Sequence, residues 1–176
     1  NGTWYAGEFS NGVYQGQGEW HASNGDVYRG KFEGGLWNGQ GSLTTHDSEY
    51  VGGFKQGRRE GEGTLKQGGM SYRGAFKDDQ FSGFGHLELE DGSEYQGQFA
   101  QGKPHGEGKR SDASGNEFTG TFVNGQLEGT GIFNSAEGDQ YEGEFKDNQL
   151  NGKGRFENAD GDVWIGEFKD GALTGQ

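Results

Sequence analysis

The sequence predicts an all-β protein, an elongated, single-layer, twisted antiparallel sheet of stacked β-hairpins. Three observations lead to this fold class: aromatic residues recur every 22 or 23 residues, glycines keep fixed offsets from them, and turn-forming residues separate the segments in between. A fixed period of this size indicates a repeat architecture, in which each unit packs only against its neighbours. Gly accounts for 39 of 176 residues, and glycine at this frequency disfavours helices throughout.

Each repeat unit begins at one aromatic residue, counted here as position zero. Gly follows at two, Phe at four, a turn residue at seven, Gly at eleven and thirteen, and a mostly apolar residue at fifteen. The register residues are Tyr5, Tyr28, Tyr50, Tyr72, Tyr95, Phe118, Tyr141 and Trp164. They divide a single array over 1–176 into units 5–27, 28–49, 50–71, 72–94, 95–117, 118–140, 141–163 and a partial 164–176, with 1–4 as the remnant of a preceding unit.

The first unit shows why each half predicts one strand of a hairpin. Residues 5–10 alternate, which places positions zero, two and four on one face. The Asn-Gly pair at 11–12 is a tight-turn signal, because Gly adopts positive φ without strain. A second strand is expected over about 14–21, and the Asn-Gly-Asp run at 24–26 turns the chain into the next unit.

The glycines inside the predicted strands need a physical reason, because Gly weakens a strand. We expect the flat rings at positions zero and four to lie across the glycines of neighbouring strands, which makes one face a thin aromatic–glycine layer. The opposite face should be solvated. It carries mixed residues such as Arg29, Lys31, Arg73, Lys77, Gln96, Gln98, Glu142, Glu144 and Lys146.

The copies of the repeat unit differ informatively at positions seven, nine and fifteen. Position seven is Asp79 in the fourth unit and Asn148 in the seventh, and both residue types tolerate left-handed turn conformations. Position nine is bulky except at Arg59 and Pro104, and position fifteen is apolar except at Arg110. We therefore expect units three and five to interrupt the apolar stripe.

The repeated pattern Y-x-G-x-F-x-x-G-x-x-x-G-x-G covers nearly the whole chain and resembles the MORN repeat family. The resemblance implies a stack of hairpins that is generally non-catalytic and serves in scaffolding, dimerisation, peptide binding or membrane association. We predict a non-catalytic repeat scaffold for protein–protein interaction or self-association through its aromatic groove, within a larger protein. Two alternatives stay open, an accessory module of an attached enzyme such as a caspase-like (legumain-clan) peptidase, and association with membrane lipid.

The net charge and the composition reduce the classes of binding partner that we expect. A net charge of −13 argues against nucleic acid, whose binding needs Lys and Arg, and against docking on anionic lipid. We expect a protein or peptide partner that is apolar and basic, or a second copy of the chain recruited by open strand edges. There is no Cys, and no apolar run approaches the roughly 20 residues of a membrane span. A cytoplasmic and a bacterial envelope location both stay open.

No catalytic, cofactor-binding or metal-ligating residue is predicted. Residues 97–103 match the start of a phosphate-binding loop, but Pro104 stands where Ser or Thr is required. The acidic turns lack the spacing of a calcium loop. The four histidines fall at four different repeat positions, with no carboxylate signalled opposite them, and are interpreted as surface side chains. They are His21, His46, His86 and His105.

The aromatic stripe is the candidate functional surface. Either it is only the core of a one-layer sheet, or its outer side chains stay partly exposed and form a groove, since contiguous exposed apolar patches mark binding sites. We expect the partner-binding groove at positions nine and fifteen. Its residues are Tyr14, Trp20, Trp37, Phe81, Leu127, Phe133, Leu150 and Phe156.

Overall fold

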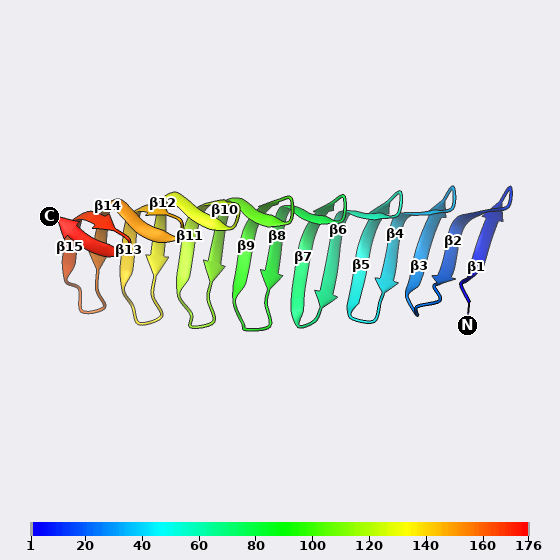
Figure 1. Ribbon diagram of the computed structural model, residues 1–176, viewed down its shortest axis with the longest axis horizontal. Helices are drawn as coiled ribbons and strands as arrows, with labels where there is room; N and C mark the ends of the chain where they lie inside the picture. The colour runs from blue at the N-terminus through cyan, green and yellow to red at the C-terminus, as the bar shows by residue number, and fades with distance from the viewer. Residues whose placement is uncertain (1, 176) are drawn as a thin grey trace. The chain divides into compact units, whose positions relative to one another are not determined.

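The computed structural model describes residues 2–175, and over that range the chain forms β-strands and turns with no helix (Figure 1). The predicted all-β class, with hairpins stacked in an open antiparallel sheet, is confirmed. Asn1, which belongs to the predicted remnant 1–4, and Gln176 lie outside the described residues. Contacts within the chain define two compact parts, an N-terminal half over residues 1–90 and a C-terminal half over residues 91–176.

The N-terminal half contains four hairpins whose strands pair in chain order, each antiparallel to the next. Its strands are β1 (Trp4–Ser10), β2 (Val13–His21), β3 (Val27–Glu33), β4 (Leu36–Thr44), β5 (Ser48–Lys55), β6 (Arg58–Gln67), β7 (Met70–Lys77) and β8 (Gln80–Glu88). The predicted strands of the first unit therefore agree with β1 and β2 to within one residue at each end.

The C-terminal half repeats the same arrangement of sequential antiparallel strands. Its strands are β9 (Glu94–Ala100), β10 (Lys103–Ser111), β11 (Glu117–Val123), β12 (Gln126–Asn134), β13 (Gln140–Lys146), β14 (Gln149–Glu157), β15 (Val163–Lys169) and β16 (Ala172–Gly175). Residues 97–100 lie in β9 and residues 101–102 in its hairpin turn, so the phosphate-loop match at 97–103 is ordinary repeat structure.

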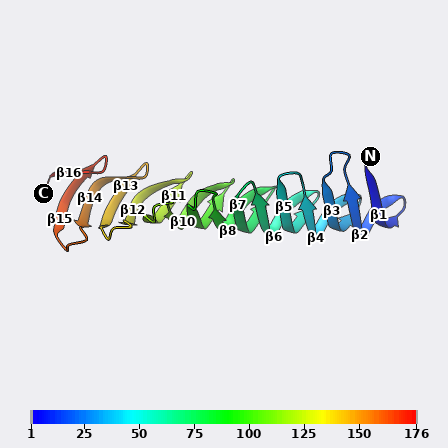
Figure 2. The same ribbon diagram turned by 90° about the horizontal axis from the view of Figure 1, so that it is seen from below.

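Two kinds of turn lie at opposite ends of the strands (Figure 1). Within each unit a two-residue turn has positive φ at both residues, as at Asn11 (φ 51°) and Gly12 (φ 76°), which is the type I′ geometry of tight hairpins. Asp79 (φ 68°) and Asn148 (φ 66°) adopt the same conformation, which confirms the turn prediction for position seven. Longer turns connect most units to the next, and several are visible from below in Figure 2, whereas β6 and β7 are joined by the two residues 68–69 alone.

The pairing register sets which residues share a face. Position zero lies opposite position fifteen on both neighbouring strands, so Tyr28 pairs with Trp20 on β2 and with Leu43 on β4. Position four lies opposite position nine within its own hairpin, as Phe32 does with Trp37. Rings at these four positions therefore gather on one face of the sheet.

Buried rings at positions zero and four form the core of each half. Tyr28 is fully buried, and its hydroxyl donates a hydrogen bond to the carbonyl of Lys31 at 2.9 Å. A Cβ atom added at Gly41 would lie 2.5 Å from the Tyr28 hydroxyl and 2.7 Å from its ring carbons, so the ring occupies the space that any larger residue would need. The prediction that rings lie over strand glycines is confirmed for the tyrosines at position zero.

The opposite face of the sheet is solvated, as predicted. All nine residues expected on that face are exposed: Arg29, Lys31, Arg73, Lys77, Gln96, Gln98, Glu142, Glu144 and Lys146. The ring face is therefore the face that excludes water, although single apolar side chains such as Val51, Phe84 and Ile165 are exposed elsewhere.

Candidate functional site

The ring face of the N-terminal half contains a cavity of about 310 Å³. Its walls are built by stacking: Trp37 lies parallel to the buried Tyr28 ring at 4.6 Å, and Trp20 meets Trp37 at 5.6 Å and 65°. The side chain at position nine thus covers the ring at position zero and forms the outer surface of the ring face. The lining residues are Tyr14, Trp20, Phe32, Gly35, Leu36, Trp37 and Gly57, three of which belong to the predicted groove.

A second cavity, of about 400 Å³, lies on the ring face of the C-terminal half. Its lining is mainly apolar and includes no charged side chain. The lining residues are Phe133, Leu150, Phe156, Trp164, Phe168, Gly171 and Leu173, and three of these were predicted as groove residues. The structure therefore divides the predicted groove into two cavities, one in each half.

The second cavity depends on a change in the repeat at Trp164. The tyrosines at position zero are held over their glycines by a hydroxyl that donates to the carbonyl three residues on, and Trp164 has no hydroxyl. At Gly166 an added Cβ would lie 1.9 Å from the carbonyl oxygen of Gly175 and 3.1 Å from Cδ1 of Leu173, so the backbone of β16 and Leu173 limit the space there. Trp164 tilts toward Phe156, with ring centroids 5.6 Å apart, and becomes a cavity wall.

The same exchange occurs at Phe118, the other register residue without a hydroxyl. Leu127 fills the space over Gly120, where an added Cβ would lie 2.9 Å from its Cδ1 atom, and Phe118 tilts toward Phe133 at 4.8 Å. Leu127 is consequently fully buried, so the expectation that it stays partly exposed in the groove is wrong. A position-nine Leu can replace a register ring when that ring has no hydroxyl.

Phe81 has a different role from the other predicted groove residues. Its ring stacks on Tyr72 with centroids 3.8 Å apart and meets Phe76 edge-on at 5.6 Å. It stays half-buried but lines neither of the two cavities. Its position is that of a cover over the core, as Tyr14 and Trp37 are in their own units.

The two arginines on the ring face pack against the neighbouring rings. The Arg59 guanidinium lies over Tyr50 at 5.7 Å and over Phe76 at 5.3 Å, and Arg110 lies over Phe118 at 4.8 Å. A planar guanidinium packs on a ring face and is attracted by its quadrupole. Arg59 and Arg110 therefore place charge in the apolar stripe and keep its ring contacts.

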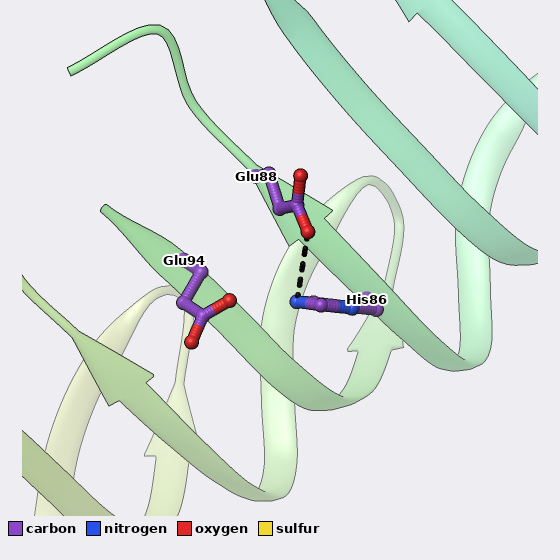
Figure 3. A group of neighbouring side chains, drawn as sticks. All are labelled: His86, Glu88 and Glu94. Atoms are coloured by element: carbon purple, nitrogen blue, oxygen red, sulfur yellow. Dashed lines mark ion pairs between the residues drawn. The ribbon is translucent and has the colours of Figure 1, made fainter. Parts of the chain in front are cut away.

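Two histidines have carboxylates beside them, which the sequence interpretation missed. His21 contacts Glu19 on β2. His86 lies 3.7 Å from Glu88 on β8, and Figure 3 shows these two side chains together with Glu94. The signal was the spacing of two residues, which places both side chains on the same face of a strand. Both pairs lie on the solvated face, where ion pairs contribute little to stability.

The negative charge is concentrated in the turns that connect repeat units. The C-terminal half has seven Lys and Arg residues against sixteen Asp and Glu residues. Its connecting segments at 111–117, 134–140 and 157–163 contain seven of these acids and no Lys or Arg. They are Asp112, Glu117, Glu137, Asp139, Glu157, Asp160 and Asp162. One end of the strands is therefore an acidic margin beside the ring face.

A search for membrane-spanning helices within residues 2–175 finds none of the required length and apolar character.

Comparison with known proteins gives one family and one fold. A model of the MORN repeat matches residues 5–27, 28–48, 50–68, 72–94, 95–117, 118–140 and 141–163. No curated protein matches the chain. Among solved structures, the TCP domain of SAS-4 (dCPAP) from Drosophila melanogaster, determined in complex with a proline-rich motif of Ana2 (dSTIL), is similar with a TM-score of 0.54. The two are 12% identical, and the match covers 87% of this chain and 84% of that one, which shows a shared fold.

Proposed function

The chain belongs to the MORN repeat family, and from this membership we propose that it is a non-catalytic scaffold that binds a protein segment on its ring face. The observation that carries the proposal is the pair of apolar cavities built by positions nine and fifteen. Concave, mainly apolar sites with a few polar groups at their margin are typical binding sites. The groove residues of the proposal are therefore Tyr14, Trp20 and Trp37 in one half, and the three lining residues Phe133, Leu150 and Phe156 in the other.

The partner class proposed is a peptide segment that is apolar and basic. Apolar side chains complement the cavities, and Lys or Arg complements a chain of net charge −13, which would also speed its association. The TCP domain with the similar fold was solved with a proline-rich motif bound, which supports a peptide as the kind of ligand. Aromatic-lined grooves commonly hold extended segments of this type.

A displayed random-peptide library selected on the chain tests the proposal. We expect selected peptides to lose about tenfold or more in affinity when Trp37→Ala or Phe156→Ala removes a cavity wall, as at the centre of other interfaces. Arg73→Ala, on the solvated face, is the matched control and should leave affinity unchanged. Circular dichroism and urea unfolding establish that each variant is folded.

Two outcomes would contradict the proposed function. One is the absence of any selected peptide, and the other is binding that Arg73→Ala weakens while the cavity variants do not. If sedimentation shows instead that copies of the chain associate and that cavity variants prevent it, the bound segment belongs to a second copy.

A further inference from the structure

We infer that the cavity of the C-terminal half is a two-point docking site for an extended segment in which an apolar side chain lies next to Lys or Arg. The apolar side chain enters the cavity beside Phe156 and Trp164, and the cation pairs with the acidic turn over residues 158–162. This inference rests on the proposed function and adds the place of the two contacts and the chemistry of the partner.

The cavity wall lies directly at the base of the acidic turn. Phe156 and Trp164 face each other across β14 and β15. They are the last ring on β14 and the first on β15, and Glu157 and Val163 are the only residues between them and the turn over 158–162. A bound segment that places a side chain in the cavity beside these rings therefore has its neighbouring residues within reach of the turn.

The turn itself is ordered and leaves carboxylates free. Asn158 donates its N–H to the carbonyl of Asp162 at 3.0 Å, which closes the loop. The neighbouring turn packs against it, since Asp139 accepts a hydrogen bond from the N–H of Ala159 at 3.0 Å. Within residues 2–175, neither Asp160 nor Glu137 of that neighbouring turn has a hydrogen-bond or ion-pair partner, and both are exposed.

Charge complementarity identifies the occupant as a cationic segment of another protein. The three connecting turns of this half, over 112–116, 135–139 and 158–162, carry five acids and no Lys or Arg, so a second copy would place like charges together. The cavity of the N-terminal half differs, because the turn at 22–26 beside Trp20 has Asp26 as its one acid, and the side-chain amide of Asn24 already donates to that carboxylate at 2.9 Å. The two cavities should therefore prefer different segments.

Three synthetic peptides serve as probes: acetyl-GLRLRG-amide, its charge-reversed match acetyl-GLELEG-amide, and acetyl-GSRSRG-amide, which keeps the cations without the apolar side chains. Binding is followed by NMR on the ¹⁵N-labelled chain through its four tryptophan indole signals. We expect the Leu–Arg peptide to shift the Trp164 signal saturably and more than the signals of Trp4, Trp20 and Trp37. The Leu–Glu and Ser–Arg peptides should bind more weakly.

Variants separate the two contacts. Asp160→Asn and Glu137→Gln are exposed changes that leave the fold intact, and each should weaken the Leu–Arg peptide about two- to fivefold, less at high salt. Phe156→Ala should weaken it about tenfold or more. Circular dichroism and urea unfolding report whether that variant is folded.

The inference is overturned if the Leu–Arg peptide leaves Trp164 unmoved, if the Leu–Glu peptide binds equally, or if both carboxylate variants keep full affinity. It is also overturned if dimerisation, measured by sedimentation, produces the same shift of the Trp164 signal. Library peptides that bind only at Trp37 would uphold the proposed function and remove this site alone.

Discussion

Substitution of Gly41 by Ala tests whether the rings over the glycines hold this fold together. Gly41 lies in β4 without positive φ, so Ala meets no backbone strain there. The added methyl carbon would lie 2.5 Å from the Tyr28 hydroxyl and 2.7 Å from two of its ring carbons. Such contacts are far inside van der Waals distance, so the ring has to move.

The Tyr28 ring has little freedom to move. It is fully buried, its hydroxyl bonds the carbonyl of Lys31 at 2.9 Å, Trp37 stacks on one side at 4.6 Å, and Phe54 meets it edge-on at 5.1 Å. Overpacking of a filled core destabilises by about 1–3 kcal/mol. A displaced hydroxyl would lose a hydrogen bond of about 1 kcal/mol, and the intrinsic gain of Ala over Gly in a strand offsets about 0.5–1 kcal/mol. We expect a net loss of about 2 kcal/mol.

Urea unfolding followed by circular dichroism and tryptophan fluorescence measures this loss as a lower midpoint. Gly175→Ala is the matched control, because an added Cβ there has no neighbour within 4 Å, and its midpoint should not fall. In a Tyr28→Leu background the penalty for Gly41→Ala should shrink, since a flexible side chain can yield. An unchanged midpoint for Gly41→Ala, or the same penalty in both backgrounds, would refute the ring-over-glycine account.

Two further predictions follow from the ring face. Burial raises the pKa of Tyr50 and Tyr72 to about 12 from an ordinary value near 10, so the native state keeps protons that the unfolded chain loses between those values. Stability should be complete below pH 10 and fall as the pH approaches 12. Urea midpoints measured from pH 9 to 12 check this, and a constant midpoint would contradict it. Arg59→Lys should lower the free energy of unfolding by about 1 kcal/mol, because Lys cannot both cover the Phe76 ring and bond Asp79, whereas Arg59→Leu should cost less because three other units carry Leu at this position. In the same unfolding assay, a lower free energy of unfolding for Arg59→Leu than for Arg59→Lys would contradict the packing role of the guanidinium.

Much of the fold could be predicted from spacing alone. A repeat of 22 or 23 residues with Asn-Gly type turns determines hairpins, and alternation places Tyr5 and Gly7 on one face, so a ring and a glycine have to meet. These relations depend on backbone geometry, and the period of the sequence determines that geometry directly. The structure confirms them at strand ends, at turn φ angles and in the contacts of Gly41.

The details of the candidate site could be predicted only in part. Positions nine and fifteen were identified because they flank the rings, but spacing does not say which side chain fills the space over a glycine. That choice depends on a hydroxyl at position zero and on a Leu nine residues later, as Phe118 and Leu127 show. The cavity beside Trp164 arises from the same competition and needed side-chain packing to be seen.

The central claim, that a protein segment binds on the ring face, is tested most directly by a structure of the chain with a bound, library-selected peptide. We predict an apolar side chain of the peptide in the cavity beside Phe156 and Trp164, with a Lys or Arg close to Asp160. A peptide bound on the opposite face around Arg73, or paired with β1 as an added strand, would contradict the account.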